Sequence, residues 1–315
     1  MAGERATELL SHPRAAPAWV RASQPPSSTA QVATSAGSSA AIAPQLDLVL
    51  TADRRGHTYL SRQRVGYPFH LGRSLYVPGD PPGMPTLYVQ SCSGGIFEED
   101  RLAWRVVASE GARAHLTSAA STIVHTMEAG HAVQQVELEA HAGTYLEYLP
   151  DPMILFRDAR VTSSVRLRAH SQAVALVSDA LVTHDPLGAD QAFDWISAEM
   201  RVEDLDGTLL ACDRFRLTGT ALSQAVPGVT NAFRCLGGFV ALCPGSTVPD
   251  LVDALRTVLP ATEEVYAGAS RLPSGRGVWV RVLGRDAAGL RWALRSAWYA
   301  ARRVLVGAEP TPRRK

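Results

Sequence analysis

Apolar and polar residues alternate with a period of two between Leu46 and Leu222, and Gly or Pro residues interrupt the alternation at short intervals. A period of two places successive side chains on opposite faces of a β-strand. Segments such as Leu46–Leu50, Leu102–Val107 and Ala132–Glu139 fit this description. Many short strands without helices between them exclude a βαβ fold. The sequence therefore predicts a mainly β fold with a large, antiparallel, multi-stranded body, either a sandwich or a β-helix-like stack.

The pattern changes near residue 248, where helical spacing begins. Val248–Leu259 has Pro249 in its first turn, followed by apolar residues three and four apart. Gly277–Leu283 alternates again as a strand, and Asp286 then precedes a longer segment with one apolar stripe. We therefore expect two or more helices near the C-terminus.

Three regions of the chain differ in composition. Residues 1–45 are rich in Ala, Ser, Pro and Thr and have no acidic residue between Glu8 and Asp47, which predicts a disordered arm. Residues 46–307 form one β-rich domain with C-terminal helices, and 308–315 form a flexible tail. No apolar run approaches the ~20 residues that a membrane-spanning helix needs, so we expect no membrane partner.

The charged residues exclude several kinds of function. The 31 basic and 30 acidic residues leave a net charge of +1, which argues against a nucleic-acid partner. Lys315 is the only lysine, so the fold offers no lysine for a phosphate-binding P-loop or a pyridoxal Schiff base. The sequence also lacks a nucleophile elbow and a zinc-protease motif. We predict no catalytic residue, no enzymatic activity and no permanently bound cofactor.

The cysteines indicate the compartment. Cys92, Cys212, Cys235 and Cys243 are scattered and show neither zinc-finger spacing nor a Cys-x-x-Cys pair. Reduced thiols are typical of a cytosolic protein, so we expect a cytoplasmic location.

Two carboxylates in the segment Thr144–Phe156 are the first candidates for binding a cation. Glu147 shares a strand face with Tyr145 and Leu149, and Asp151 lies between two prolines. A carboxylate among apolar residues is costly unless it is paired, hydrogen-bonded or offered to a metal. Both a metal-binding role and a structural role, with an arginine-paired Glu147 and a turn-forming Asp151, remain open.

Asp100 and His125 are further candidates. Asp100 ends an acidic run that follows Gly94-Gly95, and this run suits a cation better than a phosphate. His125 is one of four histidines in the β stretch, with His115, His131 and His141, and imidazole is a common nickel ligand. A solvated hairpin turn and structural histidines are the alternative interpretation.

Several segments, taken in order, resemble the UreD (UreH) family of urease accessory proteins. They are Gly94-Gly95 with Asp100 and Leu102, the Thr-rich strand Leu116–Thr122, Gly143 with Leu146–Pro150, Asp206-Gly207 with Asp213-Arg214, and Gly268–Gly284. The order and spacing match over about Gly66–Gly307, while the loops at 93–100 and 184–190 depart from the family pattern.

The resemblance implies a non-enzymatic scaffold that binds UreF, and through it the GTPase UreG, and docks on apo-urease. It also implies that nickel passes in transit to the urease active site, for which Glu147, Asp151, Asp100 and His125 are the candidate path. The alternative is a β-sandwich module that binds a ligand or carbohydrate through Tyr145, Tyr148 and Trp104.

Overall fold

The computed structural model describes residues 42–259 and 262–311. Most of the predicted arm (1–41) and the end of the predicted tail (312–315) lie outside the described residues, and the predicted domain boundaries stay a prediction. Within the described part of the tail, Pro310 is buried and the Thr311 hydroxyl donates a hydrogen bond to the Pro78 carbonyl at 2.6 Å.

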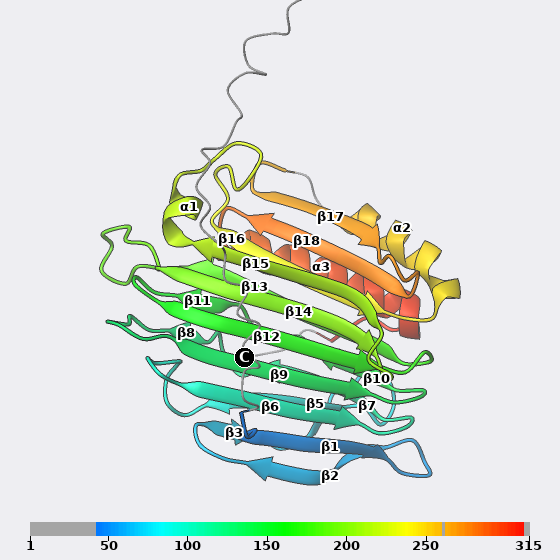
Figure 1. The fold of residues 1–315 in the computed structure, drawn as a ribbon. Helices are drawn as coiled ribbons and strands as arrows, with labels where there is room; N and C mark the ends of the chain where they lie inside the picture. The colour runs from blue at the N-terminus through cyan, green and yellow to red at the C-terminus, as the bar shows by residue number, and fades with distance from the viewer. Residues whose placement is uncertain (1–41, 260–261, 312–315) are drawn as a thin grey trace, which may run out of the picture. The chain divides into compact units, whose positions relative to one another are not determined.

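Two facing β-sheets make up most of the described chain (Figure 1). Sheet A has the order β15 (Leu209–Thr218), β14 (Trp195–Asp204), β12 (Arg160–Ala169), β9 (Ala132–Ala140), β6 (Arg101–Ala108), β1 (Leu46–Ala52), β2 (Thr58–Val65). Sheet B has the order β17 (Val265–Arg271), β18 (Gly277–Gly284), β16 (Cys235–Leu242), β13 (Val174–Thr183), β10 (Tyr145–Tyr148), β7 (Arg113–Ser118), β5 (Pro85–Ser91), β3 (Phe69–Leu71). The short strands β4 (Leu75–Tyr76), β8 (Ile123–Val124) and β11 (Met153–Leu155) also belong to sheet B.

The mainly β prediction is confirmed, including its β-helix-like form, but the prediction of an antiparallel body is wrong for the centre of both sheets. From β5 to β14 the chain passes back and forth between the sheets, with the short strands β8 and β11 as additional members of sheet B, so it returns to each sheet one coil later in the same direction. The pairs β6–β9, β9–β12, β12–β14, β7–β10 and β10–β13 are therefore parallel. Antiparallel pairs such as β1–β2, β14–β15 and β16–β18 flank this stack. A period of two reports which face a residue lies on and carries no information about strand direction.

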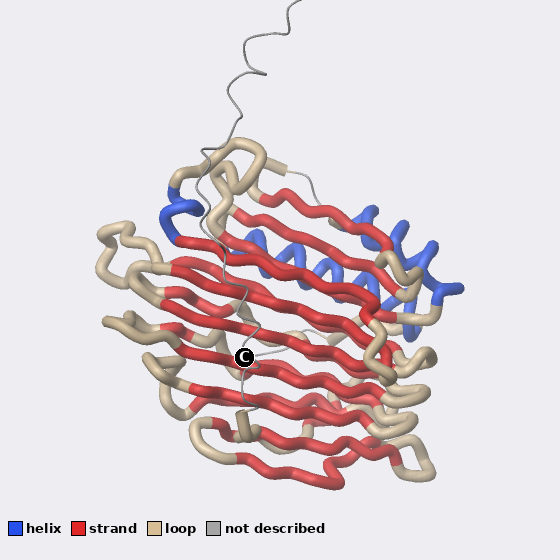
Figure 2. The backbone as a smooth tube through the Cα atoms, viewed as in Figure 1, coloured by secondary structure: helices blue, strands red, loops and turns tan. Residues whose placement is uncertain are grey.

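The helices follow the sequence prediction closely. Helix α2 spans Val248–Val258 with a proline in its first turn, and α3 spans Ala287–Val306. The Asp286 side chain caps α3 by accepting a hydrogen bond from the Gly289 N–H at 2.8 Å. A short helix α1 (Gly219–Ser223) and a 3-10 turn (Gly245–Thr247) complete the helical segments of the described chain. Figure 2 shows α2 and α3 on the side of sheet B that faces away from sheet A.

Apolar side chains form a core on each side of sheet B. Between the sheets lie residues such as Leu48, Val106 and Leu167, all fully buried. Between sheet B and the helices lie Phe239, Leu290 and Ala297. Sheet B is thus buried on both faces along much of its length, which is why Gly237–Cys243 is almost entirely apolar.

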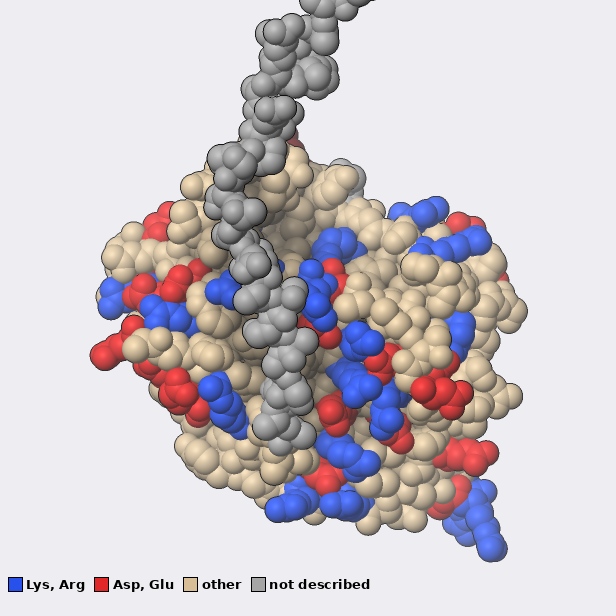
Figure 3. Space-filling view, viewed as in Figure 1, with Lys and Arg blue, Asp and Glu red and all other residues tan. Residues whose placement is uncertain are grey.

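The outer face of sheet A is charged. Figure 3 shows Arg side chains interspersed with Asp and Glu side chains over its strands. Some of them pair across neighbouring strands, as Arg166 of β12 does with Glu203 of β14, and others along one strand, as Arg201 does with Glu203. This pairing accounts for arginines and carboxylates on the outward positions of the same strands.

Candidate functional site

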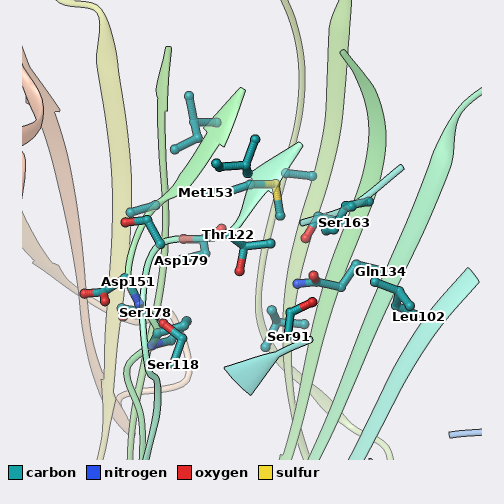
Figure 4. A pocket seen from close by; sticks show the side chains of 18 of the residues that line it. Ser91, Leu102, Ser118, Thr122, Gln134, Asp151, Met153, Ser163, Ser178 and Asp179 are labelled. Atoms are coloured by element: carbon teal, nitrogen blue, oxygen red, sulfur yellow. Dashed lines mark hydrogen bonds between the residues drawn. The ribbon is translucent and has the colours of Figure 1, made fainter. Parts of the chain in front are cut away.

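A cavity of about 350 Å³ lies between the two sheets, and we call it the inter-sheet cavity. On sheet A its lining includes one complete inward row that the strand register aligns: Leu102, Gln134, Ser163, Ala198 and Phe215. Sheet B and its loops contribute Ser91, Ser118, Thr122, Ser178 and Asp179. Figure 4 shows Gln134 and Ser163 on the opposite side of the cavity from Asp179. A cavity of this size with hydroxyl, amide and carboxylate groups can hold ordered water.

Sheet B is interrupted beside this cavity by the segment 150–152, Pro-Asp-Pro. Strand β10 ends at Tyr148 and β11 begins at Met153. Pro150 and Pro152 have no N–H to donate to a neighbouring strand, and the Asp151 N–H donates instead to the Ser118 hydroxyl at 2.8 Å.

A second cavity of about 210 Å³ lies on the other face of sheet B, beneath α3, and we call it the helix-side cavity. Pro150, Asp151 and Ser178 line both cavities, so the two adjoin at the interruption. Asp151 therefore lies where the two cavities adjoin, and its role in a nickel path stays a prediction.

Asp179 and Arg281 lie on the same inward row of sheet B, with Gly238 of β16 between them in the register. A Cβ atom at Gly238 would lie 2.6 Å from the Asp179 Oδ1 atom and 3.8 Å from the Arg281 Nη1 atom. The absence of a Cβ at Gly238 thus leaves open the space beside both side chains.

Arg281 also joins the two sheets. Its Nη2 atom forms an ion pair with Asp213 on β15 of sheet A. Its guanidinium carbon lies 5.8 Å from the centre of the Phe215 ring, within the range of a cation–π contact. Burial raises the pKa of Asp179 to about 6, and the nearby Arg281 limits that rise.

Glu147 is fully buried on β10 and accepts hydrogen bonds from several side chains. The Tyr145 hydroxyl donates at 2.6 Å, the Trp298 indole N–H at 3.0 Å, and Arg302 donates through Nε at 2.9 Å and Nη2 at 3.0 Å. The His115 Nδ1 atom lies 2.7 Å from Oε2. Trp298 and Arg302 belong to α3, so Glu147 fastens this helix to sheet B.

The charges around Glu147 are balanced within the protein. Burial would raise the pKa of Glu147, but the hydrogen bonds and charges of His115 and Arg302 outweigh it and lower the pKa to about 2. The Arg302 Nη1 atom also pairs with the buried Asp80 at 2.6 Å. The arrangement matches the arginine-paired alternative that the sequence left open for Glu147, and its role in a nickel path stays a prediction.

Asp100 and His125 lie together in loops at one rim of the stack. The Asp100 carboxylate accepts a hydrogen bond from the Phe97 N–H at 2.8 Å. The His125 ring stacks on the Phe97 ring at 4.3 Å, and its Nε2 atom lies 3.3 Å from the Gly94 carbonyl oxygen. Neither residue lines the inter-sheet cavity, although Gly94 and Gly95 do. Of the four candidates, Asp151 alone lines this cavity, while His115 and Trp298, partners of Glu147, line the helix-side cavity.

The four histidines of the β stretch do not converge on one point. His115 contacts Glu147, His141 contacts Glu139, and His131 lies against Trp195. Over residues 42–259 and 262–311, no group of three or more His, Cys, Asp or Glu side chains is placed to hold a metal ion.

The aromatic residues of the alternative binding module are buried. Tyr145, Tyr148 and Trp104 are all less than a tenth exposed, so they form no surface platform for a carbohydrate. In the same described part of the chain, no helix is both long and apolar enough to cross a lipid bilayer.

Sequence reasoning missed Asp179, Asp213 and Arg281. The one sequence feature that could have pointed to them is the pair Gly237-Gly238, which in the sequence is only part of a short apolar run. A Cβ at Gly237 would lie 3.0 Å from Leu290 on α3. Gly237 therefore lets α3 pack closely on one face of sheet B, and Gly238 leaves room for side chains on the other face.

These features define a class of protein: a β-solenoid-like fold with a cavity between its two sheets that apolar side chains and a few polar and charged ones line. The family model of the UreD urease accessory protein matches residues 43–315. The chain is 42% identical over 260 residues to urease accessory protein UreD 1 of Pseudomonas syringae pv. syringae, covering 82% of this chain and 91% of that protein. It is 34% identical to UreD 1 of Methylorubrum extorquens and 35% identical to UreD of Natronomonas pharaonis, each over 82% of this chain and 87% and 86% of the relative. The chain belongs to the UreD family of urease accessory proteins.

Proposed function

We propose that this chain is a non-enzymatic scaffold that binds UreF and UreG, docks on apo-urease and helps to deliver nickel into the urease active site. Membership of the urease accessory family supports the urease role. The lack of an internal lysine supports a division of labour in which a separate protein supplies the GTPase. The described cysteines are all free thiols, which supports a reducing compartment such as the cytoplasm.

The inter-sheet cavity is the observation that carries the nickel part of the proposal. Carboxylates are suitable ligands for a hydrated divalent cation that must bind weakly enough to leave again. Asp151 and Asp179 face this cavity, and hydroxyl and amide groups line it between them. Nickel is the cargo here, and the same side chains would hold it only in passing.

Deletion of the gene tests the proposal. We expect the deletion strain to assemble urease that lacks nickel at ordinary medium nickel, and the intact gene supplied in trans should restore loading. Nickel per urease active site is measured by elemental analysis of the purified enzyme. Co-purification of UreF and UreG with the affinity-tagged full chain tests the scaffold role. Nickel-replete urease from the deletion strain would refute the proposal.

A further inference from the structure

Arg281 is the only cationic side chain among the described residues that line the inter-sheet cavity. The other charged lining residues are Asp151 and Asp179, and Asp213 meets Arg281 from the opposite sheet. An excess of carboxylates around one guanidinium attracts further cations, and the guanidinium neutralises part of that charge while the cavity is empty of metal.

The position of Arg281 is built by three elements. Strand β18 carries it, Gly238 on β16 leaves room for it beside Asp179 on β13, and Asp213 on β15 holds its Nη2 atom. The atoms Asp179 Oδ1 and Arg281 Nη1 both lie within 4 Å of the point that a Cβ at Gly238 would occupy. The guanidinium is thus paired with Asp213, and its charge also acts on Asp179, which lies on the same inward row.

We propose that Arg281 is a positioning residue that serves as the resident counter-charge of the inter-sheet cavity. Its guanidinium is paired with Asp213, on the same inward row as Asp179, when no cargo is present, and an arriving divalent cation displaces it. After the cation leaves, the guanidinium returns to the carboxylates, which favours release over retention. This inference rests on the proposed nickel function of the same cavity and adds to it how the cavity avoids trapping its cargo.

The side chain can move without losing its apolar support. Its guanidinium carbon lies 6.0 Å from the Trp279 ring centre and 5.8 Å from the Phe215 ring centre. Aromatic faces stabilise a guanidinium that has left its carboxylate partners. About a third of the Arg281 side chain is solvent-accessible, which gives it room for a change of rotamer.

Nickel binding by the purified full chain tests the proposal, with equilibrium dialysis against ⁶³Ni²⁺ as the readout. Arg281→Gln keeps a polar side chain but exposes both carboxylates, so we expect at least tenfold tighter nickel binding than in the wild type. Asp179→Asn combined with Arg281→Gln should return binding to the wild-type level. Arg281→Lys keeps the charge and should bind nickel as the wild type does. Arg160→Gln is the matched control, because it breaks an Arg–Asp ion pair, with Asp194, away from the cavity.

A second readout separates release from binding. In cells, Arg281→Gln should lower nickel per urease active site at least fivefold while the yield of soluble protein stays at the level of Arg160→Gln. Folded Arg281→Gln protein that binds nickel no more tightly than the wild type would overturn the role of Arg281.

If Arg281→Gln is insoluble, Asp179→Asn decides the question, because it leaves the Arg281–Asp213 pair intact. Soluble Asp179→Asn should reduce urease loading at least fivefold, and unchanged loading would overturn the proposal. If either variant fails in this way while deletion of the gene still prevents urease activation, the role of Arg281 is wrong and the proposed accessory function is unaffected. A deletion strain with nickel-replete urease would instead remove the accessory function itself.

Discussion

Replacement of Glu147 by Gln measures how strongly sheet B holds α3. The substitution keeps the shape of the side chain but removes the negative charge that Arg302 faces. It also replaces one acceptor oxygen by an NH₂ group, which then faces other hydrogen-bond donors. Removing one member of a buried ion pair costs about 3–5 kcal/mol, because the other charge is left uncompensated. Asp80 still pairs with Arg302, so we expect the lower end, about 3 kcal/mol.

Two further variants bracket this value. Arg302→Met removes its ion pairs with both Asp80 and Glu147, so it should cost more than Glu147→Gln. Tyr145→Phe removes one hydrogen bond to Glu147 and should cost about 1 kcal/mol. Arg303→Met is the control, because its ion pair with Glu309 is largely exposed and contributes less than about 1 kcal/mol.

Urea unfolding followed by circular dichroism, at pH 7.5, measures these differences in the free energy of unfolding. The low pKa of Glu147 also predicts the direction of the pH dependence of stability. The stabilising contribution of Glu147 is present above the unfolded-state pKa, near 4.5, and is lost as the pH falls toward about 2. Wild type and Glu147→Gln should therefore begin to converge in stability below about pH 4.5 and differ least near pH 2. A loss of under 1 kcal/mol for Glu147→Gln, or lowered nickel loading with unchanged stability, would refute a fastening role and favour a place for Glu147 in the nickel path.

Three other predictions concern the cavity. Asp151→Asn should lower nickel per urease active site with the yield of partner complex unchanged, and loading that falls only with soluble complex would exclude Asp151 from the path. Gly238→Ala should cost about 1–3 kcal/mol of unfolding free energy, because its Cβ would lie 2.6 Å from the Asp179 carboxylate; stability equal to wild type in urea would contradict this. Asp179 binds its proton more tightly in the folded chain, so its contribution is full below pH 4 and is lost as the pH rises through about 6. Asp179→Asn should accordingly be more stable than wild type at pH 7.5 by about 1–2 kcal/mol, and a less stable variant would show that the ionised carboxylate stabilises the fold.

The elements of this fold are visible in the sequence because each depends on local pattern. The alternation in Ala132–Glu139 corresponds to β9, and Pro249 and Asp286 mark the starts of α2 and α3. The strand direction is not visible, because it depends on which sheet the next strand joins. That choice is made by the loops between the sheets and by burial, and a period of two is the same in both cases.

The candidate site was only partly predictable for a similar reason. Asp151 could be found because prolines flank it in the sequence, and a proline interrupts the hydrogen bonds between strands wherever it lies. Asp179, Asp213 and Arg281 come from three strands on two sheets, and only the register of β13, β16 and β18 with the facing β15 brings them together. The partner of Glu147 on α3 likewise depends on how a distant helix packs.

Parallel, in-register stacking explains why a cavity can cross several coils. In such a stack, equivalent positions of successive coils fall on one row, so a run of small or polar residues at one position opens a continuous space. Gln134, Ser163 and Ala198 occupy such a row, while the next inward row, with Val136, Val165 and Met200, is apolar and closes the core. The row ends at Phe215 on β15, beside Asp213 and its ion pair with Arg281. The direction of the cavity therefore follows the stacking axis, and the pair Arg281–Asp213, which we propose acts on a passing cation, lies where the parallel rows give way to antiparallel strands.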